Sequence, residues 1–352
     1  MNVFADFHHS DLMLSLQLLF EKRLGWKLYR PIGEEWFTEG YWKLAEPYNN
    51  NPATIAQYLD KRGVIPEDGT KPLNTSIIDI DDYYLIDSPT MNQRAITLDR
   101  FKRMDIDIVI ASIPDHFESF SRLIKDHKRN ARLICQFGNI LWNIKDYPYK
   151  NIMASIAPQK VPSGYNTVFY HQEFDTDVFN YEPPKGGRHI RSFVNILETA
   201  SIYEEDWKTF QEVEKLLPQY AFESYGSSCR EGVVNGHKEI AKKMKESLFG
   251  FHLKSGGDGF GHILHNWFAV GRPPIVRYSQ YEGKLAGELM SDGETCIFVD
   301  GLTPEEIANK ITHYSSREKH KTLCKNAYKM FKRKVNFDAE FQRIKLFLKN
   351  LH

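Results

Sequence analysis

KSGGDGFGH (254–262), followed by ILHNWFAVGRPPIV (263–276), is the most informative stretch of this 352-residue chain. An apolar strand-like run precedes it, and a helical pattern begins at its end. The glycines permit a tight turn and let a ligand approach the backbone closely. The first turn of a helix offers unpaired N–H groups and the positive end of the helix dipole, which suit a diphosphate. A strand–helix turn that binds nothing has the same pattern, so the motif alone leaves both interpretations open.

Strand-like and helical segments alternate along both halves of the chain, which predicts βαβ units with mostly parallel sheets. The helical patterns lie at 92–104, 115–129, 203–217, 237–246, 261–270 and 281–290, and further helices begin at Ser10 and Thr303, the expected N-caps. The expected strands are 2–7, 26–32, 76–80, 106–112, 132–137, 152–156, 167–171, 191–197, 220–225, 248–253, 274–278 and 295–300.

A domain boundary is expected near NYEPPKGGRH (180–189), which has two Pro, two Gly and little apolar content. A chain of 352 residues is too long for one ordinary core and comfortable for two. We therefore predict an N-terminal Rossmann-like domain at 1–182 and a C-terminal one at 183–352. Residues 33–75 are rich in Asn, Pro, Gly, Tyr and Trp, and we expect them to form an insertion in the first domain.

The composition is that of an ordinary globular protein without a global charge. Lys plus Arg equals Asp plus Glu, at 46 each, so a nucleic-acid partner is disfavoured without being excluded. The four cysteines lack zinc-binding spacing, which indicates free thiols in a reducing compartment. The N-terminus does not resemble a signal peptide, and no run approaches the ~18 apolar residues of a membrane span. We expect a cytoplasmic enzyme with no transmembrane segment.

The glycine-rich stretch resembles the donor-site motif of the group 1 family of retaining GT-B glycosyltransferases. That motif has an acidic residue, Gly-Phe-Gly, a second acidic residue, and then Ala-x-Gly-x-Pro-x-Ile. Asp258 holds the first acidic position, and Asn266 stands at the second, where it can still hydrogen-bond but carries no charge. The remaining motif positions match in order and spacing: Gly259, Phe260, Gly261, Ala269, Gly271, Pro273 and Ile275.

Two further segments resemble the same family. DTDVF (175–179) is similar to the Asp-Thr-Asp-x-Phe segment that often ends the N-terminal domain of these enzymes. TCIFVDG (295–301) resembles the strand and loop that follow the donor motif. The resemblance covers most of 167–310, whereas the N-terminal half matches only in its alternation of strands and helices.

The resemblance implies a GT-B fold, in which two Rossmann-like α/β domains enclose an interdomain cleft. It implies a hexosyltransferase that moves a sugar from a UDP- or GDP-sugar to a hydroxyl of a carbohydrate, a lipid-linked sugar or another acceptor, with retention of configuration. The nucleotide-diphosphate sugar is a substrate, and nothing in the sequence requires a metal or another cofactor. By the same resemblance, the terminal helix at 336–352 is expected to pack back on the N-terminal domain.

The donor is expected to bind in the C-terminal domain, with loop amides on its phosphates and with Asp258 and Asn266 on its sugar or ribose. The Arg and Lys that neutralise the diphosphate in the family are not evident after FVNIL (193–197). Lys254 is the first candidate to replace these phosphate-binding cations, and Arg230 or Arg272 is the alternative. The predicted donor-binding residues are Lys254, Gly257, Asp258, Gly259, Phe260, Gly261, His262 and Asn266.

The acceptor is expected at the carboxyl ends of N-terminal strands, the edge where open α/β sheets bind ligands. His8, His9 and Asp11 follow the first strand and are the predicted catalytic residues, because histidine handles protons near neutral pH and a carboxylate binds or deprotonates a hydroxyl. A capped helix start with an exposed histidine pair explains these residues equally well. Residues after two further strands are candidates for the acceptor site or cleft: Asp115, His116, Gly138 and Asn139.

Two other functions remain open. One is a glycosyltransferase that acts on modified bases of DNA, as some phage enzymes do, and a basic N-terminal cleft would favour it. The other is a catalytically silent GT-B-like binding module, which Asn266 and the missing basic residues would support. Donor binding without hydrolysis or transfer would distinguish this module from an enzyme.

Overall fold

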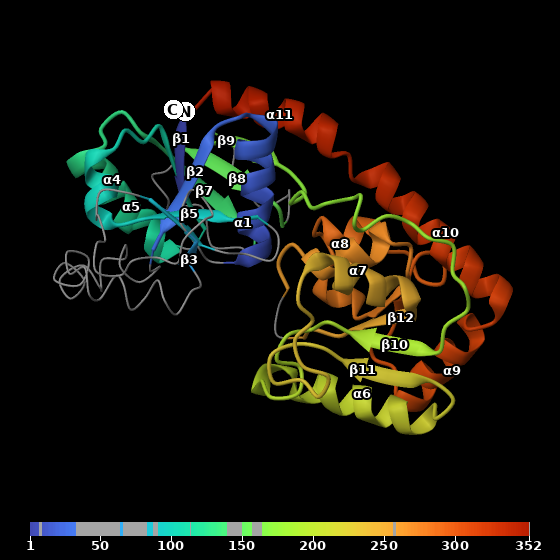
Figure 1. Ribbon diagram of the computed structural model, residues 1–352. Coiled ribbons are helices and arrows are strands. Elements are labelled where there is room, and N and C mark those ends of the chain that lie inside the picture. Colours follow the sequence, from blue (N-terminus) through green and yellow to red (C-terminus); the bar gives the residue numbers. More distant parts are fainter. Residues whose placement is uncertain are drawn as a thin grey trace. The chain divides into compact units, whose positions relative to one another are not determined.

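The structure is a computed structural model that describes residues 1–6, 9–32, 64–65, 83–86, 91–112, 114–138, 150–156, 164–255 and 258–351. Contacts divide the chain into two compact units, each with its own sheet and helices (Figure 1). The N unit comprises Met1–Ser155, Lys160–Phe174 and Asp338–His352. The C unit comprises Ile156–Gln159 and Asp175–Phe337. Apart from the short segment Ile156–Gln159, the chain passes into the C unit after Phe174, upstream of the 182/183 boundary expected from the linker composition, and returns at Asp338.

The sheet of the N unit has nine strands among the described residues, in the order β3-β4-β5-β2-β1-β6-β7-β8-β9. Neighbours from β5 to β9 run parallel, whereas β4 pairs antiparallel with both β3 and β5 at one edge. Most of the expected insertion at 33–75 and the strand expected at 76–80 lie outside the described residues. The strands are β1 (Asn2–Ala5), β2 (Lys27–Pro31), β3 (Val64–Ile65), β4 (Tyr84–Ile86), β5 (Gln93–Ile96), β6 (Ile108–Ala111), β7 (Arg132–Phe137), β8 (Asn151–Ala154) and β9 (Asn166–Phe169).

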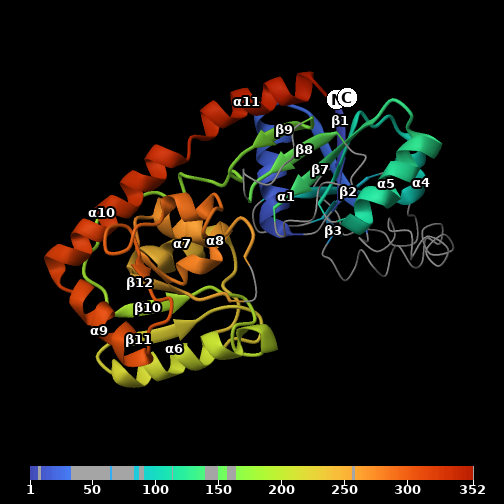
Figure 2. The same ribbon diagram turned by 180° about the vertical axis from the view of Figure 1, so that it is seen from behind.

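Helices cover both faces of this sheet, as the alternation in β1 shows. Side chains alternate between the two faces of a strand. Phe4 packs edge-on against Phe101 and Phe120, which lie on α4 (Leu98–Arg103) and α5 (Pro114–His127). Val3 and Ala5 belong instead to the core that includes α1 (Ser10–Gln17) and α11 (Phe337–Lys349). Figure 2 shows α1 and α11 on one side of the strands and α4 and α5 on the other.

Helix α11 belongs to the N unit through both apolar and polar contacts. Ile344 and Phe347 are 5% and 4% exposed in the core beside β1. Glu340 is also buried, and its carboxylate accepts hydrogen bonds from the backbone N–H of His171 at 2.7 Å and from His171 Nδ1 at 2.8 Å. The last helix therefore completes a domain whose other elements lie some 170 residues or more earlier in the chain.

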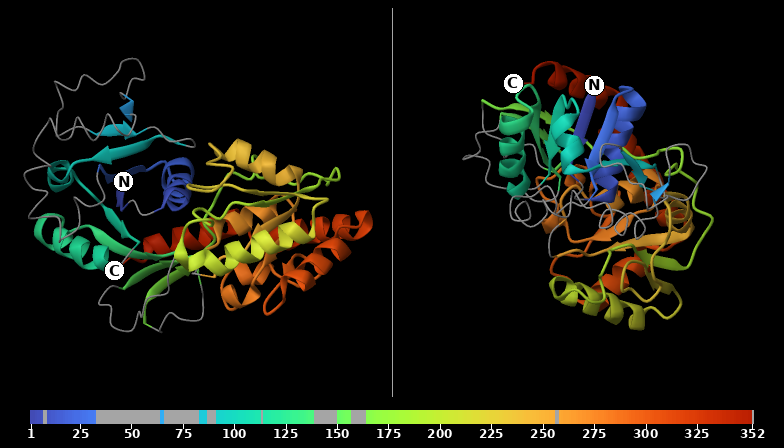
Figure 3. Two further views of the ribbon diagram at one scale, coloured as in Figure 1. Left: turned by 90° about the horizontal axis from the view of Figure 1, so that it is seen from below. Right: turned by 60° about the vertical axis from the view of Figure 1, so that its left-hand side comes forward.

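The C unit is a five-stranded parallel sheet in the order β11-β10-β12-β13-β14. Figures 1 and 3 show helices on both sides of its strands, with α7 and α8 on one face and α6 on the other. The strands are β10 (His189–Ser192), β11 (Ala221–Ser224), β12 (Ser247–His252), β13 (Pro274–Val276) and β14 (Ile297–Phe298), and the helices are α6 (Glu204–Leu216), α7 (His237–Glu246), α8 (His262–Ala269), α9 (Pro304–Tyr314) and α10 (Arg317–Lys334).

Local sequence explains several ends of these elements. Thr303 caps α9 as expected: its hydroxyl accepts from the N–H of Glu306, whose carboxylate accepts from the N–H of Thr303. The helix expected at 281–290 is replaced by turns and a short 3-10 helix, Ala286–Leu289. A Cβ on Gly287 would lie 2.2 Å from the carbonyl oxygen of Tyr281, so this packing requires a glycine.

Two α/β units with largely parallel sheets confirm the predicted fold class. Among the helices that the structure describes, none combines the length and the apolar composition that a membrane span requires.

Candidate functional site

The predicted donor loop lies at the carboxyl edge of the C-unit sheet, between β12 and α8. That edge is where open parallel sheets bind ligands. Gly261 is the N-cap of α8 and adopts a left-handed conformation with φ of 71°. A Cβ there would meet Leu264 at 3.3 Å, the Asp258 carboxylate at 3.4 Å and Ala286 at 3.5 Å. The glycine thus fits both the turn and the close packing against Asp258.

Asp258 is the centre of a buried polar network in this loop. The residue is 8% exposed. Its Oδ1 accepts a hydrogen bond from Lys254 Nζ at 3.0 Å, and its Oδ2 accepts from Tyr281 OH at 3.0 Å and from His252 Nε2 at 3.2 Å. Its backbone carbonyl accepts from Lys284 Nζ at 2.7 Å. Both side-chain oxygens are therefore held by groups of the protein itself.

This arrangement keeps Asp258 ionised. Burial alone would raise the pKa of the carboxyl, but the hydrogen bond from His252 and the charge of Lys254 outweigh burial and hold the pKa well below its usual value. The partner groups shift in the complementary direction. Burial would lower the pKa of Lys254, yet the Asp258 charge raises it. Burial and the same carboxylate raise the pKa of Tyr281. The site therefore contains a stable carboxylate–ammonium pair and a neutral phenol at neutral pH.

A second carboxylate, Asp206 at the start of α6, fixes the beginning of the loop. It is 0% exposed. It accepts from the N–H and the hydroxyl of Ser255, both at 2.7 Å, and from Arg277 Nε at 3.1 Å. Sequence reasoning missed Asp206 because the acidic segment around it gave no sign of a distant partner. The loop is thus anchored to a buried charge at Ser255, directly before Gly256 and Gly257, which lie outside the described residues.

Helix α8 presents a buried acceptor behind the loop. Asn266 is 2% exposed, and among the described residues its Oδ1 has no hydrogen-bond partner. Buried amide oxygens are rarely left in this state, so Oδ1 is suited to a donor group of a ligand. Phe260 stacks on His265 with ring centroids 4.0 Å apart. His262 begins α8, with its ring 5.8 Å from that of Phe260.

The structure brings most predicted donor residues together in one short segment. Gly259 lies buried in the turn, and Lys254 is the predicted cation that reaches the loop. Gly257 lies outside the described residues. The two alternative phosphate-binding cations are engaged elsewhere. Arg230 pairs with Glu214 at 2.9 Å, and Arg272 donates to backbone carbonyls at the opposite edge of the sheet.

In the N unit, His9 forms the N-cap of α1 in place of the expected Ser10. Its Nδ1 accepts from the N–H of Asp11 at 3.3 Å, and its side chain is 59% exposed. This is the geometry of the capped helix start that the sequence left open. His8 lies outside the described residues.

His116 forms a buried pair with Asp6, a residue that the sequence did not single out. Asp6 follows β1, and its Oδ2 lies 2.6 Å from His116 Nδ1. The same carboxylate accepts from the N–H and the hydroxyl of Ser112, both at 2.7 Å. A carboxylate at Nδ1 orients the imidazole and favours the tautomer whose Nε2 can accept a proton. Proton transfer is therefore within the chemistry of this pair.

The other acceptor candidates are only partly described. Asp115 lies in α5, but its side chain is not described, and Asn139 lies outside the described residues. Gly138 directly follows β7 and lies beside a polar cluster, since a Cβ there would be 2.7 Å from Gln172 Nε2, 2.8 Å from Gln136 Nε2 and 3.1 Å from Ser155 Oγ.

Comparisons with known proteins show the fold. No family model matches the sequence, and no curated protein matches it. HepE of Anabaena in complex with UDP-glucose is similar over 100% of both chains, with a TM-score of 0.64 and 11% identity. Sucrose-phosphate synthase of Thermosynechococcus elongatus covers 99% of this chain and 98% of its own, with a TM-score of 0.63 and 11% identity. A glycosyltransferase of Rickettsia africae covers 99% of both, with a TM-score of 0.60 and 15% identity. The chain therefore has the GT-B fold of two Rossmann-like domains.

Proposed function

We propose that this protein is a glycosyltransferase that moves a sugar from a nucleotide-diphosphate sugar, UDP- or GDP-linked, to an acceptor hydroxyl. The observation that carries the proposal is the loop that joins Lys254 and Asp258 to the amino end of α8 at the carboxyl edge of the C-unit sheet. Solved structures of the same fold include one in complex with UDP-glucose, which supports this class of donor.

In this proposal the C unit binds the donor. Backbone N–H groups at the start of α8 and the ammonium of Lys254 contact the diphosphate, whose charge grows as the glycosidic bond breaks. Asn266 Oδ1 accepts a hydrogen bond from a hydroxyl of the ribose or the sugar, which satisfies a buried acceptor. Asp258 orients Lys254 and fixes the turn, because its oxygens already have partners.

The N unit supplies the acceptor groups in the same proposal. The pair Asp6–His116 is the better placed candidate for handling the proton of the acceptor hydroxyl, because its carboxylate holds the imidazole in one tautomer. His9 and Asp11 serve the helix cap and are candidates for acceptor contacts only. The acceptor is a carbohydrate, a lipid-linked sugar or another hydroxyl compound, and transfer proceeds with retention, as the sequence motif implies.

Donor binding can be tested with two variants of one residue. A ligand at about a hundred times its dissociation constant adds ~2.7 kcal/mol of stability, so UDP-glucose or GDP-glucose should raise the melting temperature. Asn266→Ala removes the acceptor oxygen and should weaken donor binding by about threefold to tenfold, the value of one hydrogen bond. Asn266→Asp keeps an acceptor and serves as the matched control.

The outcomes separate the possible functions. Donor-dependent stabilisation together with release of the nucleoside diphosphate in the presence of an acceptor supports the enzyme. Stabilisation with no hydrolysis or transfer across a broad acceptor panel favours the binding module. No stabilisation by any nucleotide sugar, or equal donor affinity in wild type and Asn266→Ala, would contradict the proposed donor site.

A further inference from the structure

The C unit has a cavity at the amino edge of its sheet, which the proposed function does not use. Its volume is about 840 Å³. One wall is a face of α7 that carries Lys238, Lys242 and Lys245, and the other is the linker at 182–189. Sites for small molecules have volumes of about 300–1,000 Å³, so the cavity has the size of a binding site.

Both walls of this cavity are fixed by a buried arginine. Arg272 is 1% exposed. Its Nη1 donates to the carbonyl of Glu182 on the linker at 2.8 Å, and its Nε donates to the carbonyl of Lys245 at the end of α7 at 3.0 Å. Gly187 lies so close to α7 that a Cβ would be 2.5 Å from the carbonyl oxygen of Glu246. The linker is therefore held against the helix, and the cavity is built into the fold.

The lining carries a surplus of positive charge. It contains six Lys and Arg side chains and three carboxylates, which leaves three positive charges. Glu182 is already paired with Lys245 at 3.1 Å, and Glu246 lies 3.5 Å from Arg191. Asp177, on the linker, is the third carboxylate.

The cations that remain face the cavity from both walls. Among the described residues, the side chains of Arg188 and Lys238 make no hydrogen bond or ion pair, and Lys242 has a single distant partner, Glu239 at 3.8 Å. Arg188 stands on the linker and the two lysines stand one turn apart on α7. They therefore form a cationic cluster around a space of defined size.

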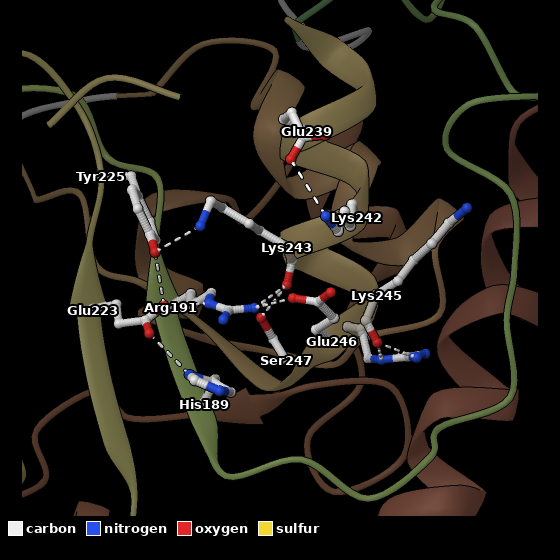
Figure 4. A network of polar contacts seen from close by, with 11 residues as sticks. His189, Arg191, Glu223, Tyr225, Glu239, Lys242, Lys243, Lys245, Glu246 and Ser247 are labelled. Atoms are coloured by element: carbon white, nitrogen blue, oxygen red, sulfur yellow. Dashed lines mark hydrogen bonds and ion pairs between the residues drawn. The ribbon is translucent and has the colours of Figure 1, made fainter. Parts of the chain in front are cut away.

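The polar network below α7 does not neutralise this cluster. Figure 4 shows Glu223 between Arg191 and His189, with Tyr225 on the same group. The carboxylate of Glu223 thus has three partners of its own. Arg191 also donates to the carbonyl of Lys243 at 2.6 Å.

We propose that this cavity binds a phosphorylated small molecule. A phosphate group offers several acceptor oxygens and two negative charges, which matches Arg188, Lys238 and Lys242. The cavity is separate from the donor loop, because β12 begins beside it at Ser247 and ends near the loop at His252. Five residue steps at about 3.3 Å each place the two sites about 17 Å apart along the strand. The inference does not depend on the proposed donor chemistry.

Hydrogen exchange with inorganic pyrophosphate tests the location of binding directly. We expect pyrophosphate to slow exchange at 182–189 and 237–247. The double variant Lys238→Gln/Lys242→Gln should lose this protection and weaken pyrophosphate binding in calorimetry by about tenfold or more, because charged hydrogen bonds are strong. Lys325→Gln/Lys329→Gln, a matched pair of exposed lysines one turn apart on α10, should leave both unchanged.

Three results would overturn the proposal. One is the absence of pyrophosphate binding, and another is protection confined to 254–266, which would assign the anion to the donor loop. The third is binding to phosphatidylglycerol vesicles that requires Lys238 and Lys242 without any protection by pyrophosphate, which would assign the cluster to a membrane surface.

Discussion

Replacing Asp258 by Asn tests whether the buried charge organises the loop. The variant keeps the size of the side chain but has one acceptor oxygen, so at least one of His252, Lys254 and Tyr281 loses its acceptor. Breaking a buried ion pair costs about 3–5 kcal/mol. The Lys254 side chain is 27% exposed, so we expect the lower end, about 3 kcal/mol. At about 2–4 °C per kcal/mol, the C unit should melt about 6–12 °C lower.

Calorimetry at neutral pH, combined with a double-mutant cycle, measures this effect. Lys254→Met removes the other charge, so the pair of substitutions should cost less than the sum of the two single ones by at least about 1 kcal/mol. The reasoning is refuted if Asp258→Asn melts like the wild type, or if the two substitutions are additive within about 0.5 kcal/mol.

The same charge predicts a pH dependence. The pKa of Asp258 is lower in the folded protein than its usual value of about 3.9, so its stabilising charge is present at neutral pH. It is lost only as pH falls below about 4 and through the folded pKa. The stability difference between wild type and Asp258→Asn should therefore be present at neutral pH and shrink as pH falls below about 4.

Three further changes test the packing and the charges. Gly261→Ala and Gly301→Ala both place a side chain at positive φ, 71° and 69°, so each should cost about 1–2 kcal/mol in thermal unfolding. Only Gly261→Ala should also weaken donor binding, because its Cβ would meet the Asp258 carboxylate of the donor loop at 3.4 Å, whereas Gly301 lies outside that loop. Burial lowers the pKa of His320 to about 4, so the unfolded chain takes up a proton at a higher pH than the folded protein does. The C unit should therefore lose about 3 kcal/mol of stability as pH falls from about 6.5 to 4. Urea titrations should show that His320→Gln largely removes this loss. Phe347→Ala should destabilise the N unit by about 3–5 kcal/mol in urea unfolding, because the Phe347 side chain fills the core between α11 and the sheet. Leu346→Ala is the control: Leu346 is 62% exposed, so its replacement should cost less than about 0.5 kcal/mol.

The sequence predicted the layered α/β architecture because each strand and helix has a local pattern. Apolar runs, helix caps and glycine or proline breaks act over a few residues, and Thr303 shows that such a signal can fix a helix start. The pattern failed at 92–104, where Gln93–Ile96 forms β5 and Thr97 caps a shorter helix. Hydrogen bonding to β2 and β4 makes residues 93–96 a strand, and a local sequence pattern carries no information about such distant partners.

The candidate donor site could be predicted only as far as its residues are contiguous. The glycine loop, Asp258 and Asn266 lie within one short segment, whereas the groups that organise them come from elsewhere. Tyr281 lies 23 residues after Asp258, and Asp206 lies 49 residues before Ser255. In the N unit, Asp6 and His116 are 110 residues apart. Parallel topology brings strand ends together, but spacing along the chain does not reveal which side chains will meet.

The charge balance of the loop leads to a final prediction about how the donor is held. Asp258 takes much of the charge of Lys254, and Asp206 takes that of Arg277, so carboxylates balance two of the three cations at the loop; the third, Lys284, donates to the backbone carbonyl of Asp258. We expect the N–H groups at the start of α8 to supply most of the hold on a diphosphate, with the ammonium of Lys254 as a secondary contact. Such short, partly buried contacts are screened less by dissolved salt than contacts between exposed charged side chains. Donor affinity measured by calorimetry should fall less than about threefold between about 50 and 300 mM NaCl. A fall of about tenfold or more would instead indicate a clamp of charged side chains.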